Sequence, residues 1–343
     1  MRENMSNKVS MFGVINLKTV LIYFLIGMFV FAFLPVSPVD AASAGNSGIY
    51  VLGNFFSKYE LSRDYVTGIS LRIGWDSIEG QKGIYDWSYL DSNIANARKY
   101  GKKVMIRVTA GENTPEWVYR EGAEQFFYTE NGVNLCMPVP WDSIYLQEWT
   151  NFILELGVRY GNMQDIVTIH MTGPAKAGEM YLADYKNITA WLNKGYSAKK
   201  LTHAWKTVIN AYAEAFHSNA LGINISKPIM INGSNRIVTD VLSYAYQILG
   251  SRLRVQGNWL SASTSDTFVL YNIVAYYADF TNVGFQMLCI ASQQRFGGTL
   301  RQGIDKGLAA GASYLEIYGV DVENTAYESD FIYADYYLKL NEH

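Results

Sequence analysis

Residues 167 to 182 read Val-Thr-Ile-His-Met-Thr-Gly-Pro-Ala-Lys-Ala-Gly-Glu-Met-Tyr-Leu, and this stretch indicates which fold the chain adopts. Its apolar, β-branched first half is typical of a buried strand, which ends at the Gly173-Pro174 pair. A lone carboxylate, Glu179, follows in the loop. Barrel enzymes present catalytic groups in this way, at the carboxyl end of a strand. The alternative interpretation is an ordinary loop glutamate in water.

Strand and helix patterns alternate on both sides of this stretch. Besides the strand of the opening stretch, strands are expected at 48–55, 68–75, 103–109, 228–232, 253–259, 283–290 and 314–319. Helices with one apolar face are expected at 89–100, 145–160, 198–216, 240–249, 268–279 and 300–310. A long loop is expected at 110–140.

Eight strands alternating with helices over this length predict an α/β fold, a (β/α)8 TIM barrel. The alternative is a doubly wound open sheet, but no strand is followed by a glycine-rich phosphate or dinucleotide loop. Residues 45–343 show no internal repeat and no Pro- or Ser-rich linker. A single domain over 45–343 is therefore expected.

The first 44 residues differ from the rest of the chain. A mildly basic start precedes an apolar run of 17 residues, 20–36, which is at the lower limit for a membrane span. Small-residue patterns that end at Ala41 and at Ala44 suit a signal peptidase. We expect a cleaved secretory signal and a secreted protein. The alternative is an uncleaved anchor that leaves the domain outside the cytoplasm on a membrane.

Composition argues against several partners and cofactors. The chain has 28 Lys and Arg against 31 Asp and Glu, a net charge of −3, which gives no argument for binding nucleic acid or an anionic membrane surface. Its two cysteines do not define the fold. None of its four histidines has a partner at ligand spacing, so no metal site is expected. No cofactor is expected either.

The last predicted strand carries an acid among apolar residues. Glu316 alternates with apolar neighbours and shares a face with Tyr318, which places both at the barrel mouth. A buried carboxylate without a function is unfavourable, which indicates a role in binding or chemistry. The alternative is a salt bridge to Arg72 or Arg107, because alternation in their own strands also places these arginines inward.

A family resemblance is visible between residues 69 and 118. Its segments are Leu71-Arg-Ile-Gly-Trp-Asp-Ser-Ile-Glu79, Gly83-Ile-Tyr-Asp-Trp87, Leu90-Asp91, Lys102-Lys-Val-Met-Ile-Arg-Val108 and Thr114-Pro-Glu-Trp-Val118. They resemble the second and third strands, with the loops that follow, of clan A glycoside hydrolases, including the family 42 β-galactosidases and family 5 relatives. Beyond this region the similarity is one of topology.

The resemblance implies cleavage of glycosidic bonds by two carboxylates, at the ends of strands four and seven. Glu179 follows strand four, where the general acid/base belongs, although the Asn that usually precedes it is Gly178 here. At strand seven the polar residue is Gln286, which cannot form a glycosyl ester. The next acid of suitable parity is Glu316, so the expected pair is Glu179 as acid and Glu316 as base. Strands four and eight lie opposite each other, which suits the roughly 6.5–9.5 Å separation of an inverting pair better than the roughly 5–5.5 Å of a retaining one.

Further residues fit a carbohydrate ligand. Aromatic residues make up 15% of the chain, and aromatic rings can stack on sugars. Four tryptophans lie at or beyond strand ends, although each could equally pack in the core: Trp75, Trp117, Trp141 and Trp259. Asp76 and Asp321 are weaker candidates that could instead cap a helix or pair with a base. The expected substrate-binding residues are Arg72, Trp75, Arg107, Trp117, Trp141, Gln256, Asn258, Trp259, Gln286 and Tyr318.

Two functions follow from these observations. The first is a secreted glycoside hydrolase that cleaves an oligo- or polysaccharide by carboxylate acid/base catalysis. The second is a catalytically inactive barrel that binds glycans. Glu179 and Glu316 favour the first function, whereas Gln286 favours the second.

Overall fold

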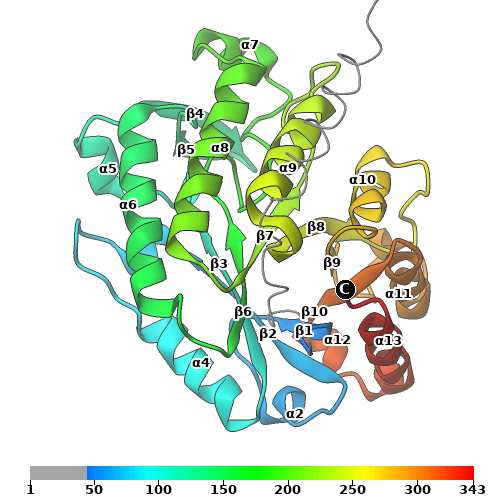
Figure 1. Ribbon diagram of the computed structural model, residues 1–343. Coiled ribbons are helices and arrows are strands. Elements are labelled where there is room, and N and C mark those ends of the chain that lie inside the picture. The colour runs from blue at the N-terminus through cyan, green and yellow to red at the C-terminus, as the bar shows by residue number, and fades with distance from the viewer. Residues whose placement is uncertain (1–44) are drawn as a thin grey trace, which may run out of the picture. The chain divides into compact units, whose positions relative to one another are not determined.

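The computed structural model describes residues 45–343, and the expected signal or anchor at 1–44 lies outside the described residues (Figure 1). The barrel belongs to the second of two units into which the chain divides, at 41/42. Across the described residues, every helix is too short or too polar to span a bilayer.

Eight parallel strands close into a barrel, which confirms the predicted fold class. Their order around the barrel is their order along the chain, so each strand pairs with the barrel strands before and after it. The strands are β1 (Gly48–Leu52), β2 (Val66–Gly74), β3 (Lys103–Thr109), β6 (Ile166–Met171), β7 (Ala220–Ile225), β8 (Leu253–Leu260), β9 (Val283–Met287) and β10 (Ala312–Tyr318).

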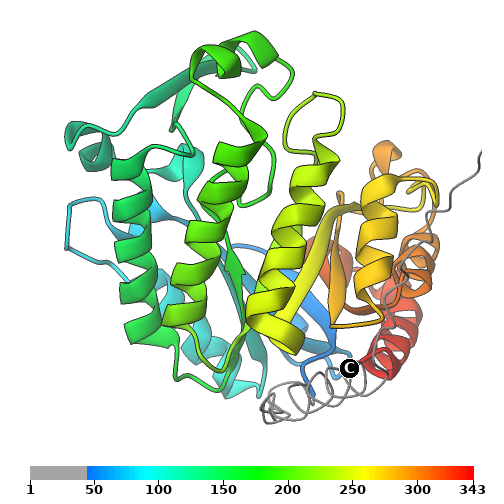
Figure 2. The same cartoon turned by 45° about the horizontal axis from the view of Figure 1, so that its top comes forward.

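Helices surround the strands on the outside of the barrel (Figure 2). The longer ones are α4 (Ser88–Lys99), α6 (Ser143–Tyr160), α8 (Ala198–Ala215), α9 (Asn235–Leu249), α10 (Val269–Tyr277), α11 (Leu300–Ala309) and α13 (Glu328–Leu340). Short helices are α2 (Lys58–Leu61), α3 (Trp75–Ile78), α5 (Glu116–Arg120), α7 (Ile188–Asn193) and α12 (Gly319–Val322). Side-chain caps mark several starts: Asp142 accepts from the Tyr145 amide at α6, and Thr299 forms a capping box at α11.

The fifth barrel strand is not where the sequence pattern predicted it. Residues 228–232 belong to the connection that follows β7, so the strand expected there was wrong. The true strand, Ala220–Ile225, contains Gly222 and Asn224, both weak strand formers. Gly222 is required by packing, because a Cβ at this position would lie 2.6 Å from Nδ1 of His170 on the neighbouring strand. Tertiary packing thus outweighs local strand propensity here.

The predicted loop at 110–140 contains a hairpin. Strands β4 (Gln125–Glu130) and β5 (Val133–Pro138) pair antiparallel outside the barrel sheet. Asn131 and Gly132 join them with φ angles of 51° and 79°. Two positive φ angles in an Asn-Gly pair are typical of a type I′ hairpin turn, and this dipeptide was the signal in the sequence for the missed hairpin.

Layers of side chains fill the barrel interior, and the lower one combines a small apolar cluster with buried Arg254, whose guanidinium carbon lies 5.2 Å from the centroid of the Tyr314 ring. The cluster consists of Tyr50, Met105, Val167 and Tyr314. Tyr314 precedes Glu316 by two residues on β10, and Met105 precedes Arg107 by two on β3, so the cluster lies below these charged groups. The polar layer therefore faces the carboxyl ends of the strands, where barrel enzymes have their active sites.

Candidate functional site

Strand register places polar residues at one level of the barrel. Arg72 pairs with Arg107 across β2 and β3, Asn224 with Gln256 across β7 and β8, and Gln286 with Glu316 across β9 and β10. Five of these six residues were candidates from the sequence, and Asn224 was identified only from the strand register. Their side chains meet because parallel strands in a closed barrel present matching positions to one interior.

Glu316 is the centre of this layer and is fully buried. Its Oε1 accepts a hydrogen bond from Ser70 Oγ at 2.6 Å, and its Oε2 accepts one from Gln256 Nε2 at 2.8 Å. Arg107 Nη2 lies 3.4 Å from both oxygens, and Arg72 Nη2 lies 3.4 Å from Oε2. The ion pairs considered from the sequence as an alternative to catalysis are thus both present.

The charge state of Glu316 follows from these contacts. Burial raises its pKa, but the positive charges of Arg107 and Arg72 outweigh burial and hold the pKa at about 2. His170 lies 3.8 Å away, and burial followed by the charge of Arg107 lowers the pKa of its imidazole to about 3. Glu316 is therefore an anion at neutral pH, whereas His170 is neutral and forms no ion pair with it.

Amide side chains link His170 back to Glu316. His170 Nδ1 lies 2.8 Å from Asn224 Oδ1, and Asn224 Nδ2 donates to Asn258 Oδ1 at 2.8 Å. Gln256 Nε2 donates to the same oxygen of Asn258 at 2.9 Å as well as to Glu316. Gln256 and Asn258, expected to bind sugar hydroxyls, are both buried and bonded to one another. They form the floor of the site.

Gln286 lies at the end of strand seven and is nearly buried. Its Oε1 accepts a hydrogen bond from Arg72, and its Nε2 donates to Tyr318 Oη at 3.2 Å. The Arg72 side chain remains 32% exposed. Arg72, Gln286 and Tyr318 therefore border the mouth, and an amide occupies the place where the family resemblance implies a carboxylate.

Glu179 lies above this floor on the loop that follows β6. Its carboxylate is half-buried and accepts a hydrogen bond from Ser226 Oγ. Burial lowers the pKa of Arg107 to about 10, and the negative charges of Glu316 and Glu179 oppose that shift. Glu179 thus acts on the same arginine that holds Glu316 in the floor.

The residue before Glu179 explains a departure from the family pattern. Gly178 has a φ of +71°, and a Cβ there would lie 3.0 Å from Cδ of Arg107. An Asn at this position would need both a strained backbone and a shifted arginine. Glycine is therefore favoured because the loop packs directly on Arg107.

Two contacts fix the loop that carries Glu179. The Ala177 amide, in a residue with a φ of 56°, donates to both carboxylate oxygens of Glu112 at 3.1 and 3.0 Å. Lys176 Nζ lies 2.6 Å from both carboxylate oxygens of Glu130 on the hairpin. The sequence analysis identified neither Glu112 nor Lys176. The position of Glu112, an acid three residues after the end of β3, could have indicated it.

Trp75 and Trp117 lie in the core rather than in an open cleft. Trp75 is fully buried, with its ring 5.7 Å from that of Trp117 and 5.0 Å from that of Trp149. Both expected sugar-binding residues donate their indole N–H to Glu79, Trp75 to the carboxylate and Trp117 to the carbonyl, each at 2.8 Å. Their place in the core follows from α3 and α5 packing against α6.

Trp141 and Trp259 also pack against other aromatic rings. Trp141 lies 5.9 Å from the ring of Trp191 and donates to the Lys194 carbonyl at 3.2 Å. Trp259, next to inward-facing Asn258, has the opposite parity and lies 4.7 Å from the ring of Phe268. Neither is fully buried: Trp141 packs beside α7, and Trp259 packs against the rings of Tyr271 and Phe285.

The two weaker acid candidates lie apart from the floor. Asp321 is buried and accepts the Ala291 amide at 3.2 and 3.0 Å, so it holds a loop. Asp76 is exposed and accepts a hydrogen bond from Ser77 at 3.3 Å. Within 45–343, no group of three His, Cys, Asp or Glu side chains is arranged to bind a metal.

A surface cleft of about 510 Å³ borders the mouth beside Tyr318. It lies where β1 and β10 end, and Phe55 beside it is 92% exposed. Tyr318, which lines this cleft, accepts a hydrogen bond from Gln286 at the mouth.

Comparisons with known proteins agree with this geometry. The family model Glyco_hydro_42, described as beta-galactosidase, matches residues 65–307. No curated protein matches the sequence.

Similar solved structures include three β-galactosidases, each 12% identical to this chain. They come from the Antarctic haloarchaeon Halorubrum lacusprofundi (TM-score 0.55, covering 84% of this chain and 57% of that one), the psychrophilic Marinomonas ef1 (0.51, 79% and 54%) and Rahnella sp. R3 (0.54, 87% and 57%). At this identity the likeness shows the barrel fold. The chain spans little more than half the length of these structures.

Proposed function

This chain belongs to the Glyco_hydro_42 family of beta-galactosidases, and from that premise we propose that it is a glycoside hydrolase acting on an oligo- or polysaccharide with Glu179 as the proton donor. One observation carries the proposal: a half-buried carboxylate on a fixed loop at the carboxyl end of strand four. This is the place where a barrel glycosidase needs its acid.

In this mechanism the protonated Glu179 donates its proton to the oxygen of the leaving sugar. Ser226 orients the carboxyl group. Once the proton has left, the positive charge of Arg107 stabilises the carboxylate that remains. Arg72 and Tyr318 at the rim can donate hydrogen bonds to sugar hydroxyls.

Glu316 has a different role in this proposal from the base expected on sequence grounds. A base must reach the attacking water, but Glu316 is fully buried and both its oxygens already accept hydrogen bonds. A pKa of about 2 also makes it a weak base. Its burial therefore favours the ion-pair role, in which it holds Arg72 and Arg107 beneath the substrate.

Glu112 is a second carboxylate attached to the loop of Glu179. It accepts the Ala177 amide and is only half-buried. Burial raises its pKa, a shift that strengthens a carboxylate as a base. We propose Glu112, rather than Glu316, as the acceptor of the water proton.

A second function is favoured by Gln286. With an amide at the end of strand seven, the double-displacement route has no nucleophile there. The barrel would then bind a glycan at Arg72, Gln286 and Tyr318 without cleaving it. This alternative predicts binding without turnover across neutral, acidic and amino-sugar glycans.

Glu179→Gln tests the acid directly. We expect loss of reducing-end release, by about a hundredfold or more, from any glycan that the unmodified protein cleaves, with binding retained. The panel includes β-galactosides, because the family model and the similar structures carry that name. An unchanged rate would remove Glu179 from the mechanism. Azide rescue of Glu112→Gln with a change in anomeric outcome would identify Glu112 as the base, whereas rescue of Glu316→Gln instead would return that role to Glu316.

A further inference from the structure

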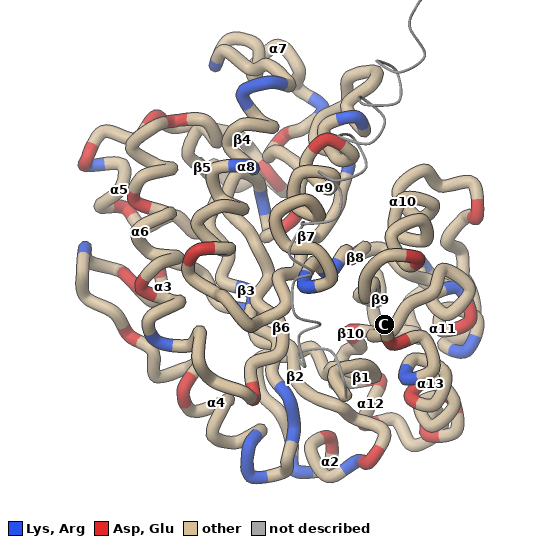
Figure 3. The backbone as a smooth tube through the Cα atoms, viewed as in Figure 1, with Lys and Arg blue, Asp and Glu red and all other residues tan. Residues whose placement is uncertain are grey.

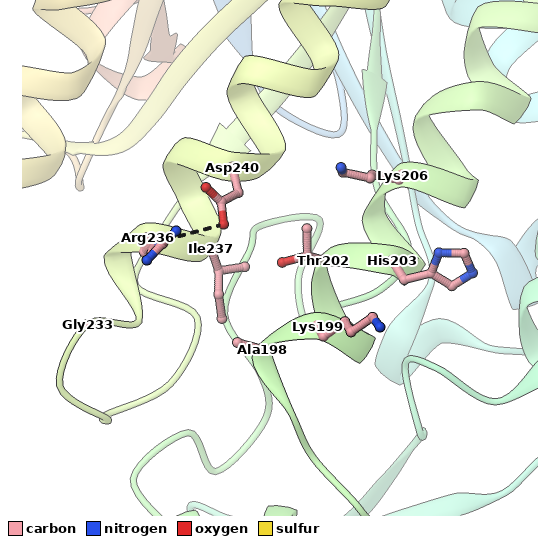
Figure 4. A pocket seen from close by; sticks show the side chains of 9 residues that line it. All are labelled: Ala198, Lys199, Thr202, His203, Lys206, Gly233, Arg236, Ile237 and Asp240. Carbon is pink, nitrogen blue, oxygen red and sulfur yellow. Dashed lines mark ion pairs between the residues drawn. The ribbon is translucent and has the colours of Figure 1, made fainter. Parts of the chain in front are cut away.

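A groove of about 560 Å³ lies between the first turns of α8 and α9, outside the site described above. In Figure 4, Thr202 and Lys206 point from α8 toward α9, where Ile237 lies on the side of the groove and Arg236 is paired with Asp240. Lys199 and His203 turn toward the outer flank of α8. The groove thus has an aliphatic and hydroxyl floor with charged groups along both walls.

The charges of this groove are mainly positive. Lys206 and Arg236 stand against one acid, Asp240, and Lys199 lies at the edge of the groove, although the whole chain has a net charge of −3. Arg236 Nε lies 3.8 Å from Asp240 Oδ2, and these side chains are 84% and 52% exposed, so the pair neutralises little. Within 45–343, Lys199 and Lys206 have no carboxylate within ion-pair distance. Figure 3 shows basic residues gathered at this end of α8 and α9.

The helix ends add to this potential. The groove residues occupy the first three turns of α8 and the first two of α9, which are 18 and 15 residues long. The amino ends of both helices carry partial positive charge. Ser234, which precedes α9, is buried, and its hydroxyl has no hydrogen-bond partner among the described residues. An anion in the groove would therefore meet complementary charge from both walls.

One connection joins the groove to Glu179. Residues 226–234 run from the end of β7 to the start of α9. Ser226 at its beginning donates to Glu179, and the Pro228 carbonyl accepts the Leu182 amide at 2.9 Å. Gly233 near its end lines the groove. The groove is therefore on the rim of the face that carries the candidate active site.

We propose that this groove binds the anionic substituent, a carboxylate or a sulfate, of an acidic glycan whose chain extends to Glu179. The proposal rests on the proposed function for the glycan, and it adds that the preferred glycan is acidic. Lys206 and Arg236 bind the oxyanion, and Thr202 and Ile237 contact the sugar ring. The Lys206 ammonium points toward α9, because its Nζ lies 4.6 Å from the centroid of the Tyr244 ring on that helix.

Calorimetric titration of the full chain tests the groove without requiring turnover. The probes are an oligogalacturonate for carboxylates, a sulfated dextran oligomer for sulfates, and a neutral galacto-oligosaccharide. The variants are Lys206→Gln, Arg236→Gln and Asp240→Asn. Lys99→Gln is the matched control, because Lys99 is an exposed lysine in the last turn of α4, at the opposite end of a helix.

We expect tighter binding of one acidic probe than of the neutral one, and the tighter acidic probe identifies the substituent. Lys206→Gln and Arg236→Gln each weaken that binding about two- to fivefold, Asp240→Asn strengthens it, and Lys99→Gln leaves it unchanged. Added salt reduces the difference between acidic and neutral probes.

Equal affinity for acidic and neutral probes, or an acidic preference that the three groove variants do not change, overturns the proposal. Turnover of a neutral glycan together with either result leaves the proposed hydrolase intact. Conversely, a groove-dependent acidic preference in a protein without turnover supports the groove and refutes the hydrolase.

Discussion

Glu316 is a buried anion whose surroundings supply a donor to each oxygen. Ser70 and Gln256 donate hydrogen bonds, and Arg107 and Arg72 supply positive charge. Removing one partner of such a cluster leaves the others buried and uncompensated, which is more destabilising than the net value of the cluster itself. The free energy of unfolding therefore depends on pH through the ionisation of Glu316.

Glu316→Gln tests this link. The folded-state pKa of about 2 is below the ordinary value of 4.5, so the stabilisation is full above pH 4.5 and is lost as pH falls from 4.5 toward 2. The shift corresponds to about 3 kcal/mol. We expect the variant to be less stable than the unmodified protein by this order at pH 7, and the difference to shrink near pH 2, as measured by urea unfolding.

The matched control is Glu155→Gln, an exposed glutamate on α6. It should change stability little at either pH. A difference between Glu316→Gln and the unmodified protein that is equal at pH 7 and pH 2 would contradict the linkage. The neutral state of His170 lowers acid stability in the parent as well, so the comparison uses differences between proteins.

Gln286 occupies the end of strand seven, where a carboxylate could act as the nucleophile. Gln286→Glu would place a carboxylate between Arg72 and Tyr318, which already contact this side chain. We expect the fold to persist and hydrolysis of β-glycosides to rise about tenfold or more, with retained anomeric configuration followed by NMR. Gln286→Met is the control without a nucleophile. Equal rates for the two variants would show that strand seven is not where the nucleophile belongs.

At the scale of elements, the insertion after strand three supports the loop after strand four. Residues Gly111–Asn113 supply Glu112 to the Ala177 amide, and the β4–β5 hairpin supplies Glu130 to Lys176. The Lys176 side chain is 9% exposed, whereas that of Glu130 is 48% exposed. The positive φ angles of Ala177 and Gly178 require support of this kind, because Ala rarely adopts that conformation.

Lys176→Met removes the hairpin contact and keeps most of the apolar length of the side chain. We expect a small loss of global stability, about 1 kcal/mol or less, because Glu130 is half exposed. Amides of 172–187 should exchange faster with solvent, and kcat should fall about tenfold with little change in KM, because Glu179 loses its fixed position.

Lys176→Arg, which can keep the ion pair, should restore both amide protection and kcat. Hydrogen exchange remains informative if the protein proves to bind glycans without cleaving them. Unchanged exchange in Lys176→Met would show that Glu112 alone fixes the loop.

At the scale of the whole molecule, the barrel is complete from its first described residues. The Asn46 amide donates to Glu342 at 3.0 Å, and Tyr50 Oη donates to the Asn46 carbonyl at 2.7 Å. These contacts close the start of β1 against the end of α13. Cleavage before residue 45 would remove neither of them.

We propose that residues 1–44 are a secretory signal, and predict a mature protein that begins at residue 42 or 45. Intact-mass measurement of protein from the culture medium should give one of these two starts. A chain of residues 45–343 should unfold at the same temperature as the mature protein, because the contacts of Asn46 remain. Full-length protein that stays in the membrane fraction would instead support an uncleaved anchor.

Local periodicity predicted much of the barrel. Alternation along single strands indicated that Arg72, Arg107 and Glu316 point inward, and the ion pairs among them confirm it. Helix positions at 145–160 and 198–216 agree with α6 and α8 to within two residues. The strand at 228–232 was wrong because Gly222 and Asn224 weaken the local signal of β7, whereas packing against His170 requires the glycine.

The sequence by itself thus determined the barrel, its family and the lone acid after strand four, because these follow from short-range patterns. Only the tertiary structure decided which of those residues are accessible. Parity cannot show that Glu316 is enclosed by donors from β2, β3 and β8, that Trp75 belongs to the core, or that Glu112 and Lys176 hold the loop of Glu179. These facts depend on the register between strands and on contacts between distant loops, which no single strand encodes.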